Sequence, residues 1–171
     1  EPRKNHRMAF EAIASLPEHI RSRTKLILLG KASYESHRQQ FMEQFDRFEE
    51  HIHIECYNGI SEEKKQELLA NASFLLFPSL CEGFGLPLLE AMLHELPIIA
   101  YDTSIAREIC GSGAMYVSEN NGSAFAQAIM NYYQIRSNGN WWRQQQREQV
   151  KKFDPSQVNS SMTTLIQQIL S

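Results

Sequence analysis

Apolar runs alternate with amphipathic stretches along most of the chain. Short apolar runs that are typical of buried strands occupy residues 25–29, 52–56, 73–78, 97–101 and 114–117. Helical spacing of apolar positions predicts helices over residues 5–16, 36–50, 61–71, 87–94, 104–109, 122–137, 141–153 and 155–170. This alternation predicts an α/β fold, in which a Rossmann-like parallel sheet carries helices on both faces and a helical C-terminal segment follows.

Local signals refine this picture. Ser61 has the residue type and position of a helix N-cap, and Asn58-Gly59 predicts a turn after the second strand. A doubly wound domain normally supplies a strand before its first helix, and this sequence shows none, so we expect the chain to begin late in its domain. Ligands of such sheets bind beyond the carboxyl ends of the strands, which directs attention to the loops there.

Composition excludes several classes of function. A chain of 171 residues with 42% hydrophobic residues fits one soluble domain, and a net charge of -3 gives no field that would attract nucleic acid. Cys56, Cys81 and Cys110 have no metal-ligand spacing, and their sparse, odd number fits a reducing compartment. No signal peptide and no bilayer-length apolar run is seen. We therefore expect a cytoplasmic location, with peripheral attachment at the inner face of the cytoplasmic membrane left open for the full-length protein.

The stretch from residue 78 to residue 92 carries the chemistry, because it joins a buried strand to a helix through a glycine loop. Gly83 and Gly85 permit unusual dihedral angles and let a ligand approach the backbone closely. Pro87 suits the first position of the helix that follows. The free N–H groups and the dipole at a helix start form an anion site, for which a diphosphate is the natural guest.

Two carboxylates flank this loop, Glu82 before it and Glu90 in what we expect to be the first helical turn. Carboxylates repel phosphate but accept hydrogen bonds from vicinal hydroxyls such as those of ribose or a hexose. The order acid, glycine loop, helix start, acid therefore predicts a diphosphate that joins two sugars. The alternative is that the glycines only form a tight turn and that Glu90 only compensates the helix dipole.

Glu82 and Glu90 match the E-x7-E motif of glycosyltransferase family 4 within its usual context, PSxxEGFGLPxLEAM. The sequence resembles this family over nearly the whole chain, from Glu1-Pro2-Arg3-Lys4-Asn5 to the helix over residues 141–153. The resemblance implies that residues 1–171 form the nucleotide-sugar-binding C-terminal domain of a GT-B enzyme, without its N-terminal acceptor domain. It implies retaining transfer of a hexose from a nucleotide diphosphate-sugar to a hydroxyl of a glycan or lipid-linked glycan.

The resemblance also implies a setting and roles for individual residues. It favours bacterial polysaccharide or lipopolysaccharide O-antigen synthesis and, slightly, a UDP-sugar over GDP-mannose. Lys4 would bind the diphosphate and Glu82 the transferred sugar, so that these two carry the catalysis. The family's second cation is an upstream arginine outside the chain, and the neighbouring Arg3 is not expected to replace it. No DxD motif is present, so no metal cofactor is indicated.

The remaining contacts follow the same resemblance. Glu90 would hold the ribose hydroxyls. Sugar hydroxyls and phosphate would meet the backbone of Gly83, Phe84, Gly85 and Leu86 in addition to Lys4 and Glu82. The weaker candidates for the nucleobase are Asn58, Gly59 and Ile60. Glu82 could instead act as a nucleophile, as in retaining glycosidases, but the family treats this residue as a sugar-binding group and favours front-face attack.

Departures from the family and rival functions remain. The segment His94-Glu95-Leu96-Pro97 replaces the family's small residue and glycine, which we expect to loosen the turn before the strand. A dehydrogenase-type dinucleotide domain would need a third glycine that Gly83-Phe84-Gly85 lacks. A GT-B epimerase or hydrolase of nucleotide sugars and a non-enzymatic α/β binding domain stay open. Trp141 and Trp142 could face a membrane, although packing is expected for at least one of them.

Overall fold

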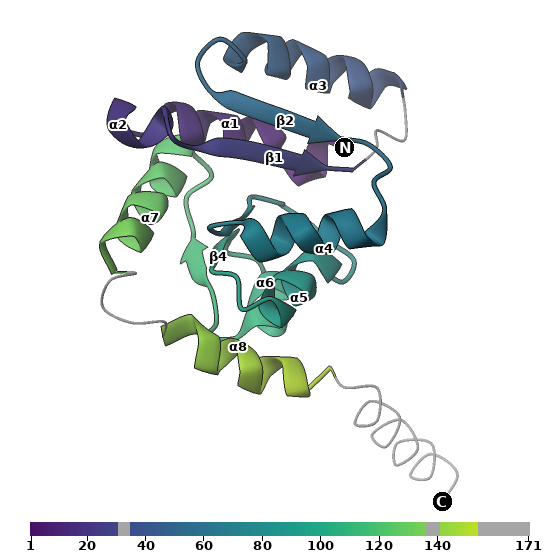
Figure 1. Cartoon of the computed structure of the whole chain (residues 1–171), viewed down its shortest axis with the longest axis vertical. Coiled ribbons are helices and arrows are strands. Elements are labelled where there is room, and N and C mark those ends of the chain that lie inside the picture. The colour runs from purple at the N-terminus through teal and green to yellow at the C-terminus, as the bar shows by residue number, and fades with distance from the viewer. Residues whose placement is uncertain (31–34, 136–140, 154–171) are drawn as a thin grey trace, which may run out of the picture.

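The computed structural model describes residues 1–30, 35–135 and 141–153 of the chain (Figure 1). The strands are β1 Lys25–Leu29, β2 His53–Tyr57, β3 Leu75–Phe77, β4 Ile98–Tyr101 and β5 Met115–Val117. The helices are η1 Pro2–Lys4, α1 His6–Ala14, α2 Glu18–Arg21, α3 Glu35–Phe48, α4 Glu62–Asn71, α5 Leu86–Leu93, α6 Ser104–Cys110, α7 Gly122–Ile135 and α8 Trp141–Lys151. The order of strands and helices is the predicted one, except that η1 and α2 were not predicted.

The strands form two parallel ladders rather than one continuous sheet. β1 pairs with β2 from Lys25 opposite His53 to Leu29 opposite Tyr57, and β4 lies between β3 and β5. Within residues 1–30, 35–135 and 141–153 no ladder joins β1 to β3. In the strand order of a doubly wound sheet, the strand that precedes the first helix lies between the strands that correspond to β1 and β3. The gap between the two ladders falls at the position of that strand.

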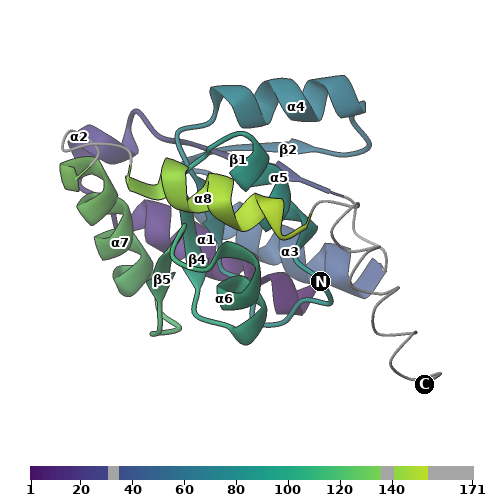
Figure 2. The same cartoon turned by 90° about the horizontal axis from the view of Figure 1, so that it is seen from below.

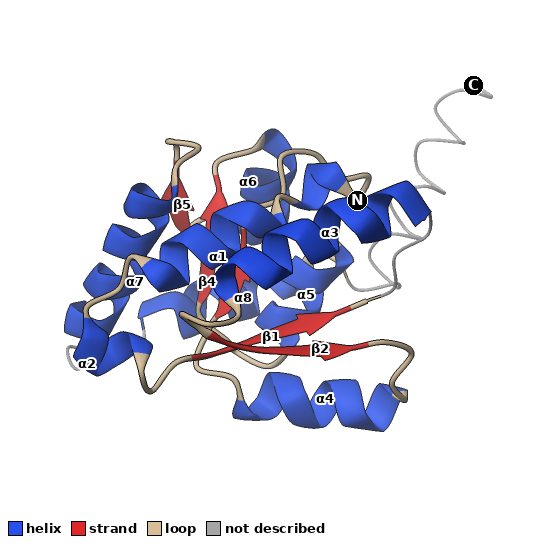
Figure 3. Cartoon of the chain, turned by 90° about the horizontal axis from the view of Figure 1, so that it is seen from above, coloured by secondary structure: helices blue, strands red, loops and turns tan. Residues whose placement is uncertain are grey.

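Helices cover both faces of the β3–β4–β5 ladder, as predicted. Along β4, Ile99 packs into a core with α1 and α7, whereas Ile98 and Ala100 pack into a second core with α5 and α6. This alternation follows from the two-residue period of a strand. Around the β1–β2 ladder, α1 and α3 lie on one side and α4 on the other (Figure 3). The α/β fold with helices on both faces is therefore confirmed.

Helix boundaries differ from the prediction by one to a few residues, and the helix expected over residues 155–170 lies outside the described residues. Ser61 caps α4 as predicted, since its hydroxyl accepts a hydrogen bond from the backbone N–H of Lys64 at 3.2 Å. Helix α2 is a single turn after Pro17, too short to leave a periodic apolar pattern.

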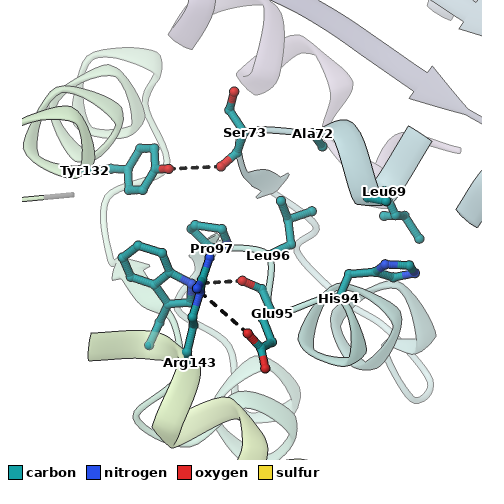
Figure 4. A pocket seen from close by; sticks show the side chains of 11 residues that line it. Leu69, Ala72, Ser73, His94, Glu95, Leu96, Pro97, Tyr132 and Arg143 are labelled. Atoms are coloured by element: carbon teal, nitrogen blue, oxygen red, sulfur yellow. Dashed lines mark hydrogen bonds and ion pairs between the residues drawn. The ribbon is translucent and has the colours of Figure 1, made fainter. Parts of the chain in front are cut away.

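Helix α8 crosses α5 and fixes the turn between α5 and β4 (Figure 2). We expected this turn to be loose, and that expectation was wrong. Glu95 adopts the left-handed backbone conformation, with φ of 52°, that the family's glycine would adopt. Its carbonyl oxygen accepts a hydrogen bond from Trp142 Nε1 at 3.0 Å, and its carboxylate pairs with Arg143 at 3.6 Å (Figure 4). The same carboxylate pairs with Arg147 at 2.5 Å.

The two tryptophans of α8 differ in exposure. Trp142 is 4% exposed, whereas Trp141 is 40% exposed. The expectation that at least one of them packs within the domain is therefore confirmed for Trp142, which also stacks edge-on against Tyr132.

Candidate functional site

The glycine loop begins at the carboxyl end of β3 and is held there by the first residues of the chain. The N–H of Leu80 donates to the carbonyl oxygen of Arg3 at 2.9 Å, and Asn5 Nδ2 donates to the carbonyl oxygen of Pro78 at 3.2 Å. These bonds connect residues more than 70 positions apart in the sequence. They bring η1, which contains Lys4, against the loop that contains Glu82.

Glu82 is bound by two cations. Lys4 Nζ lies 2.7 Å from Oε1 and Arg3 Nη1 lies 2.7 Å from Oε2, so both carboxylate oxygens are paired. Arg3 Nη1 also donates to the carbonyl oxygen of Cys81 at 3.1 Å. Burial acts to raise the pKa of Glu82, but hydrogen bonds from Lys4, Ser79 and Arg3 bring that pKa below its usual value. Glu82 is therefore ionised at neutral pH, with only 9% of its side chain exposed.

The two glycines of the loop have different roles. Gly85 is the N-cap of α5 with φ of 86°, and a Cβ there would lie 3.2 Å from Leu88 Cδ1 and 3.4 Å from Ile105 Cγ2. The dihedral angle therefore favours glycine, and a Cβ would fit only tightly against these side chains. A Cβ at Gly83 would meet nothing within 4 Å, so this backbone is open to a ligand. Helix α5 begins at Leu86, which makes Pro87 its second residue rather than its first.

Two apolar side chains of this loop are exposed. Phe84 is 47% exposed and Leu86 is 60% exposed, so the helix start is reachable from outside. The Phe84 ring meets the ring of Phe153, just beyond α8, edge-on at 6.0 Å. The predicted loop residues thus lie together on one open edge of the domain.

Glu90 is the fifth residue of α5, beyond the first turn in which we expected it. A carboxylate there gains little from the helix dipole, which weakens the dipole-compensation alternative. Its Oε1 atom instead lies 2.7 Å from Nζ of Lys65 on α4, and Lys65 also pairs with Glu62 at 2.9 Å. The hydrogen bond to Glu90 is the main cause that raises the pKa of Lys65.

The nucleobase candidates lie in the loop from β2 to α4. Asn58 and Gly59 are exposed, Ile60 is half-buried, and Gly59 has φ of 69°, which confirms the predicted turn. Lys65 extends from the start of α4, next to this loop, to Glu90 on α5. Lys65 thus links α4, the helix that follows the base candidates, to the ribose candidate Glu90 on α5.

A pocket of about 500 Å³ lies at the other end of the β3–β4–β5 ladder, next to Ser73 and Pro97, which precede β3 and β4 (Figure 4). It is therefore separate from the glycine loop. Among the described residues, no group of three or more His, Cys, Asp or Glu side chains could hold a metal ion. In the same part of the chain, no helix is long and apolar enough to cross a membrane.

Lys65 was missed from the sequence, and Arg3 was considered only as a substitute for the family's upstream arginine. Lys65 was not singled out because a lysine in an exposed, charged helix has no distinguishing pattern. Arg3 was not expected to replace the family's upstream arginine because it is next to Lys4; the structure adds that both side chains reach the carboxylate of Glu82, each at a different oxygen. A tight 3-10 turn, which η1 supplies, makes this possible.

Comparison with known proteins shows the family of the chain. The family model "Glycosyl transferases group 1" matches residues 1–152. The "O-antigen chain mannosyltransferase B" of Escherichia coli is 31% identical over 144 residues, which are 84% of this chain and 36% of that protein. The "O-antigen chain mannosyltransferase RfbU" of Salmonella typhimurium is 28% identical over 110 residues, 64% of this chain and 30% of that protein. The chain thus spans about a third of the length of these relatives.

Solved structures share the fold. Anabaena Alr3699/HepE in complex with UDP-glucose superposes with a TM-score of 0.82 at 18% identity, over 98% of this chain and 46% of that one. WaaG, a glycosyltransferase involved in lipopolysaccharide biosynthesis, superposes with a TM-score of 0.69 at 23% identity, over 89% of this chain and 40% of that one. Together with the match over residues 1–152, these similarities show that the chain belongs to the group 1 glycosyl transferases and has the α/β fold of GT-B enzymes.

Proposed function

We propose that residues 1–171 are the donor-binding domain of a retaining hexosyltransferase of glycosyltransferase family 4. The observation that carries this proposal is the arrangement of two carboxylates around the glycine loop, Glu82 paired with Lys4 and Arg3 and Glu90 paired with Lys65. The gap between the acids holds an open backbone at Gly83 and the start of α5, which suits a diphosphate. One sugar would lie on each side.

Charge grows on the β-phosphate as the bond to the sugar breaks, and a fixed positive group lowers the barrier for this step. Lys4 is that group, and it is 31% exposed, so its ammonium can turn from Glu82 to the phosphate. No metal cofactor is part of this proposal. Glu82 keeps its ion pair with Arg3 when Lys4 turns to the phosphate, which makes it a poor nucleophile and favours front-face attack, with retention, guided by the leaving phosphate.

The names of the relatives indicate the sugar. Several of them are called mannosyltransferases, two of these of the O-antigen chain. We therefore propose that mannose is transferred during O-antigen or related polysaccharide synthesis. This moves our preference from the UDP-sugar favoured by the sequence to GDP-mannose, even though structural neighbours at 18% and 19% identity hold UDP-glucose or UDP.

The other partners follow from the same proposal. The acceptor, a glycan or lipid-linked glycan, would bind mainly to an N-terminal GT-B domain outside this chain. The enzyme would work in the cytoplasm, attached peripherally to the inner face of the membrane where lipid-linked acceptors are found.

Calorimetric titration of the chain with GDP, UDP and ADP tests the proposal. We expect GDP to bind, and Glu90→Ala to weaken that binding at least tenfold, because the ribose hydroxyls lose a charged acceptor. Glu67→Ala, an exposed glutamate of α4, is the matched control and should bind as the unchanged chain does. Binding of UDP alone would overturn the mannose assignment, and failure of all three nucleotides would overturn the donor-binding function.

A further inference from the structure

Lys65 occupies an unusual position for a lysine on an exposed helix. Its side chain is only 24% exposed, and its ammonium lies 2.7 Å from Glu90 Oε1. By contrast, the side chain of the adjacent Lys64 is 40% exposed and pairs with Glu67 one turn further along α4. The Lys65–Glu90 pair joins two helices, α4 and α5, across 25 positions of sequence. It is therefore a tertiary contact of the candidate site and not a pair within one helix.

The two carboxylate oxygens of Glu90 have different surroundings because of this contact. Oε1 is held by Lys65, while Oε2 accepts no hydrogen bond from any residue that the structure describes. The Glu90 side chain is 31% exposed, so Oε2 can be reached by a ligand. A carboxylate fixed through one oxygen presents the other in a defined direction, which reduces the conformational freedom that is lost when a hydroxyl binds.

Lys65 also changes the charge of this part of the site. An unpaired carboxylate would repel the diphosphate that we propose to bind at the neighbouring start of α5. Paired with Lys65, which it shares with Glu62, Glu90 can accept hydrogen bonds while it repels the diphosphate less than an unpaired carboxylate would. Lys65 itself points at Glu90 and Glu62 and not at the glycine loop, so its effect on a nucleotide passes through Glu90.

We infer that Lys65 is a positioning residue for ribose recognition, which fixes Glu90 through Oε1 so that Oε2 accepts hydrogen bonds from the ribose hydroxyls. This inference rests on the proposed function, in which Glu90 holds the ribose of a nucleoside diphosphate. On this inference, discrimination between ribose and a ribose that lacks its 2′ and 3′ hydroxyls depends on Lys65, which lies outside the E-x7-E motif.

The test compares GDP with 2′,3′-dideoxy-GDP, which lacks both hydroxyls, on the chain carrying Lys65→Met or Lys64→Met. We expect Lys65→Met to weaken GDP about tenfold and dideoxy-GDP less than twofold, since only the hydroxyls use Glu90. Lys64→Met should change neither, and Lys65→Arg should retain most of the affinity for GDP. In the Glu90→Ala background, Lys65→Met should have no further effect.

Equal weakening of GDP and dideoxy-GDP by Lys65→Met would overturn the inference, as would a parallel loss of inorganic pyrophosphate binding, which would place Lys65 directly on the phosphates. Urea unfolding of each variant separates misfolding from loss of the contact. If the unchanged chain binds none of the three nucleotides, it is the proposed function that fails, whereas selective binding without an effect of Lys65→Met refutes the inference alone.

Discussion

At the scale of single residues, Glu82 shares its two oxygens between Lys4 and Arg3, and a diphosphate must compete with it for these cations. Glu82→Gln removes the competing charge and leaves both cations free to meet phosphate. We expect inorganic pyrophosphate to bind about fivefold more tightly, equivalent to ~1 kcal/mol between unit charges ~4 Å apart in water. Titration calorimetry at low and high salt measures this, and the gain should shrink as salt screens it.

The same substitution should lower sugar transfer in the full-length enzyme, because the transferred hexose loses a charged acceptor. Lys4→Met in the Glu82→Gln background should abolish the gain in pyrophosphate affinity. Unchanged affinity in Glu82→Gln would show that Lys4 and Arg3 do not meet the phosphates.

A second prediction at the scale of residues concerns the stability of variants at Glu95, whose backbone has φ of 52°. Glu95→Ala and Glu95→Gly both lose the ion pairs with Arg143 and Arg147, so their difference isolates the backbone. We expect Glu95→Ala to be less stable than Glu95→Gly by ~1 kcal/mol, the approximate cost of the left-handed conformation for a residue with a Cβ. Urea unfolding measures the difference.

Glu67 in the interior of α4 provides the matched control for this comparison. There the order should reverse, with the glycine variant less stable than the alanine variant by ~1 kcal/mol, because glycine is disfavoured inside a helix. The same order at both positions would contradict the assigned backbone conformation of Glu95.

Residues with a special backbone or a motif could be predicted from the sequence, whereas residues defined by a tertiary partner could not. Gly85 stands out because its glycine loop follows an apolar run, and its φ of 86° in the structure favours glycine there. Lys65 depends on how α4 packs against α5, which no local pattern encodes. The departure at Glu95 was found, but its effect was misjudged because its partners lie about 50 residues away on α8.

At the scale of elements, α8 is attached to the domain by buried hydrogen bonds. Gln146 is fully buried, and its Nε2 donates to the carbonyl oxygens of Leu96 at 2.9 Å and Gly113 at 3.0 Å. Gln146→Leu keeps the size of the side chain but leaves both carbonyls unpaired. We expect a loss of ~2 kcal/mol in the free energy of unfolding, measured by urea denaturation.

Gln144→Leu, an exposed position of the same helix, should change stability by less than ~0.5 kcal/mol. If both leucine variants behave alike, the contacts of Gln146 contribute nothing measurable. The close packing of Gln146 against Gly113 also explains why residue 113 is a glycine, because a Cβ there would lie 2.9 Å from Gln146 Cγ.

Most elements were predictable because buried strands and amphipathic helices leave periodic patterns, and β4 is apolar on both faces as a fully covered strand must be. The division into two ladders was not predicted. Pairing depends on which strands lie next to one another, and the apolar pattern of a strand is the same whichever neighbour it has.

At the scale of the whole molecule, stability should depend on pH through His6, whose pKa is lowered to about 4 by burial and by the nearby N-terminal ammonium and Lys4. The unfolded chain binds this proton near pH 6.5, so stability is complete above that pH and falls as the pH decreases from 6.5 to about 4. The expected loss is ~3 kcal/mol over this window. Urea unfolding at pH 7.5, 6, 5 and 4.5 measures it.

His6→Leu should flatten the stability profile between pH 6.5 and pH 4.5, whereas substitution of the exposed His19 by leucine should not. Below about pH 4.5 both variants should still lose stability, because ion pairs hold the pKa of carboxylates such as Glu95 and Asp102 low. A profile unchanged by His6→Leu would show that other groups cause the acid sensitivity.

In the whole enzyme, the donor and the acceptor would bind mainly to different domains. Apart from the family's upstream arginine, every contact proposed for the donor comes from this chain, whereas the acceptor would bind mainly to a domain outside it. We therefore expect the 171-residue chain to bind the donor nucleotide but to release none from GDP-mannose or a UDP-sugar, with or without a lipid-linked acceptor. A coupled assay for nucleoside diphosphate measures this, with the full-length enzyme as the positive control. Steady release by the full-length enzyme without acceptor would instead favour the hydrolase alternative, since water would then replace the hydroxyl that a transferase requires.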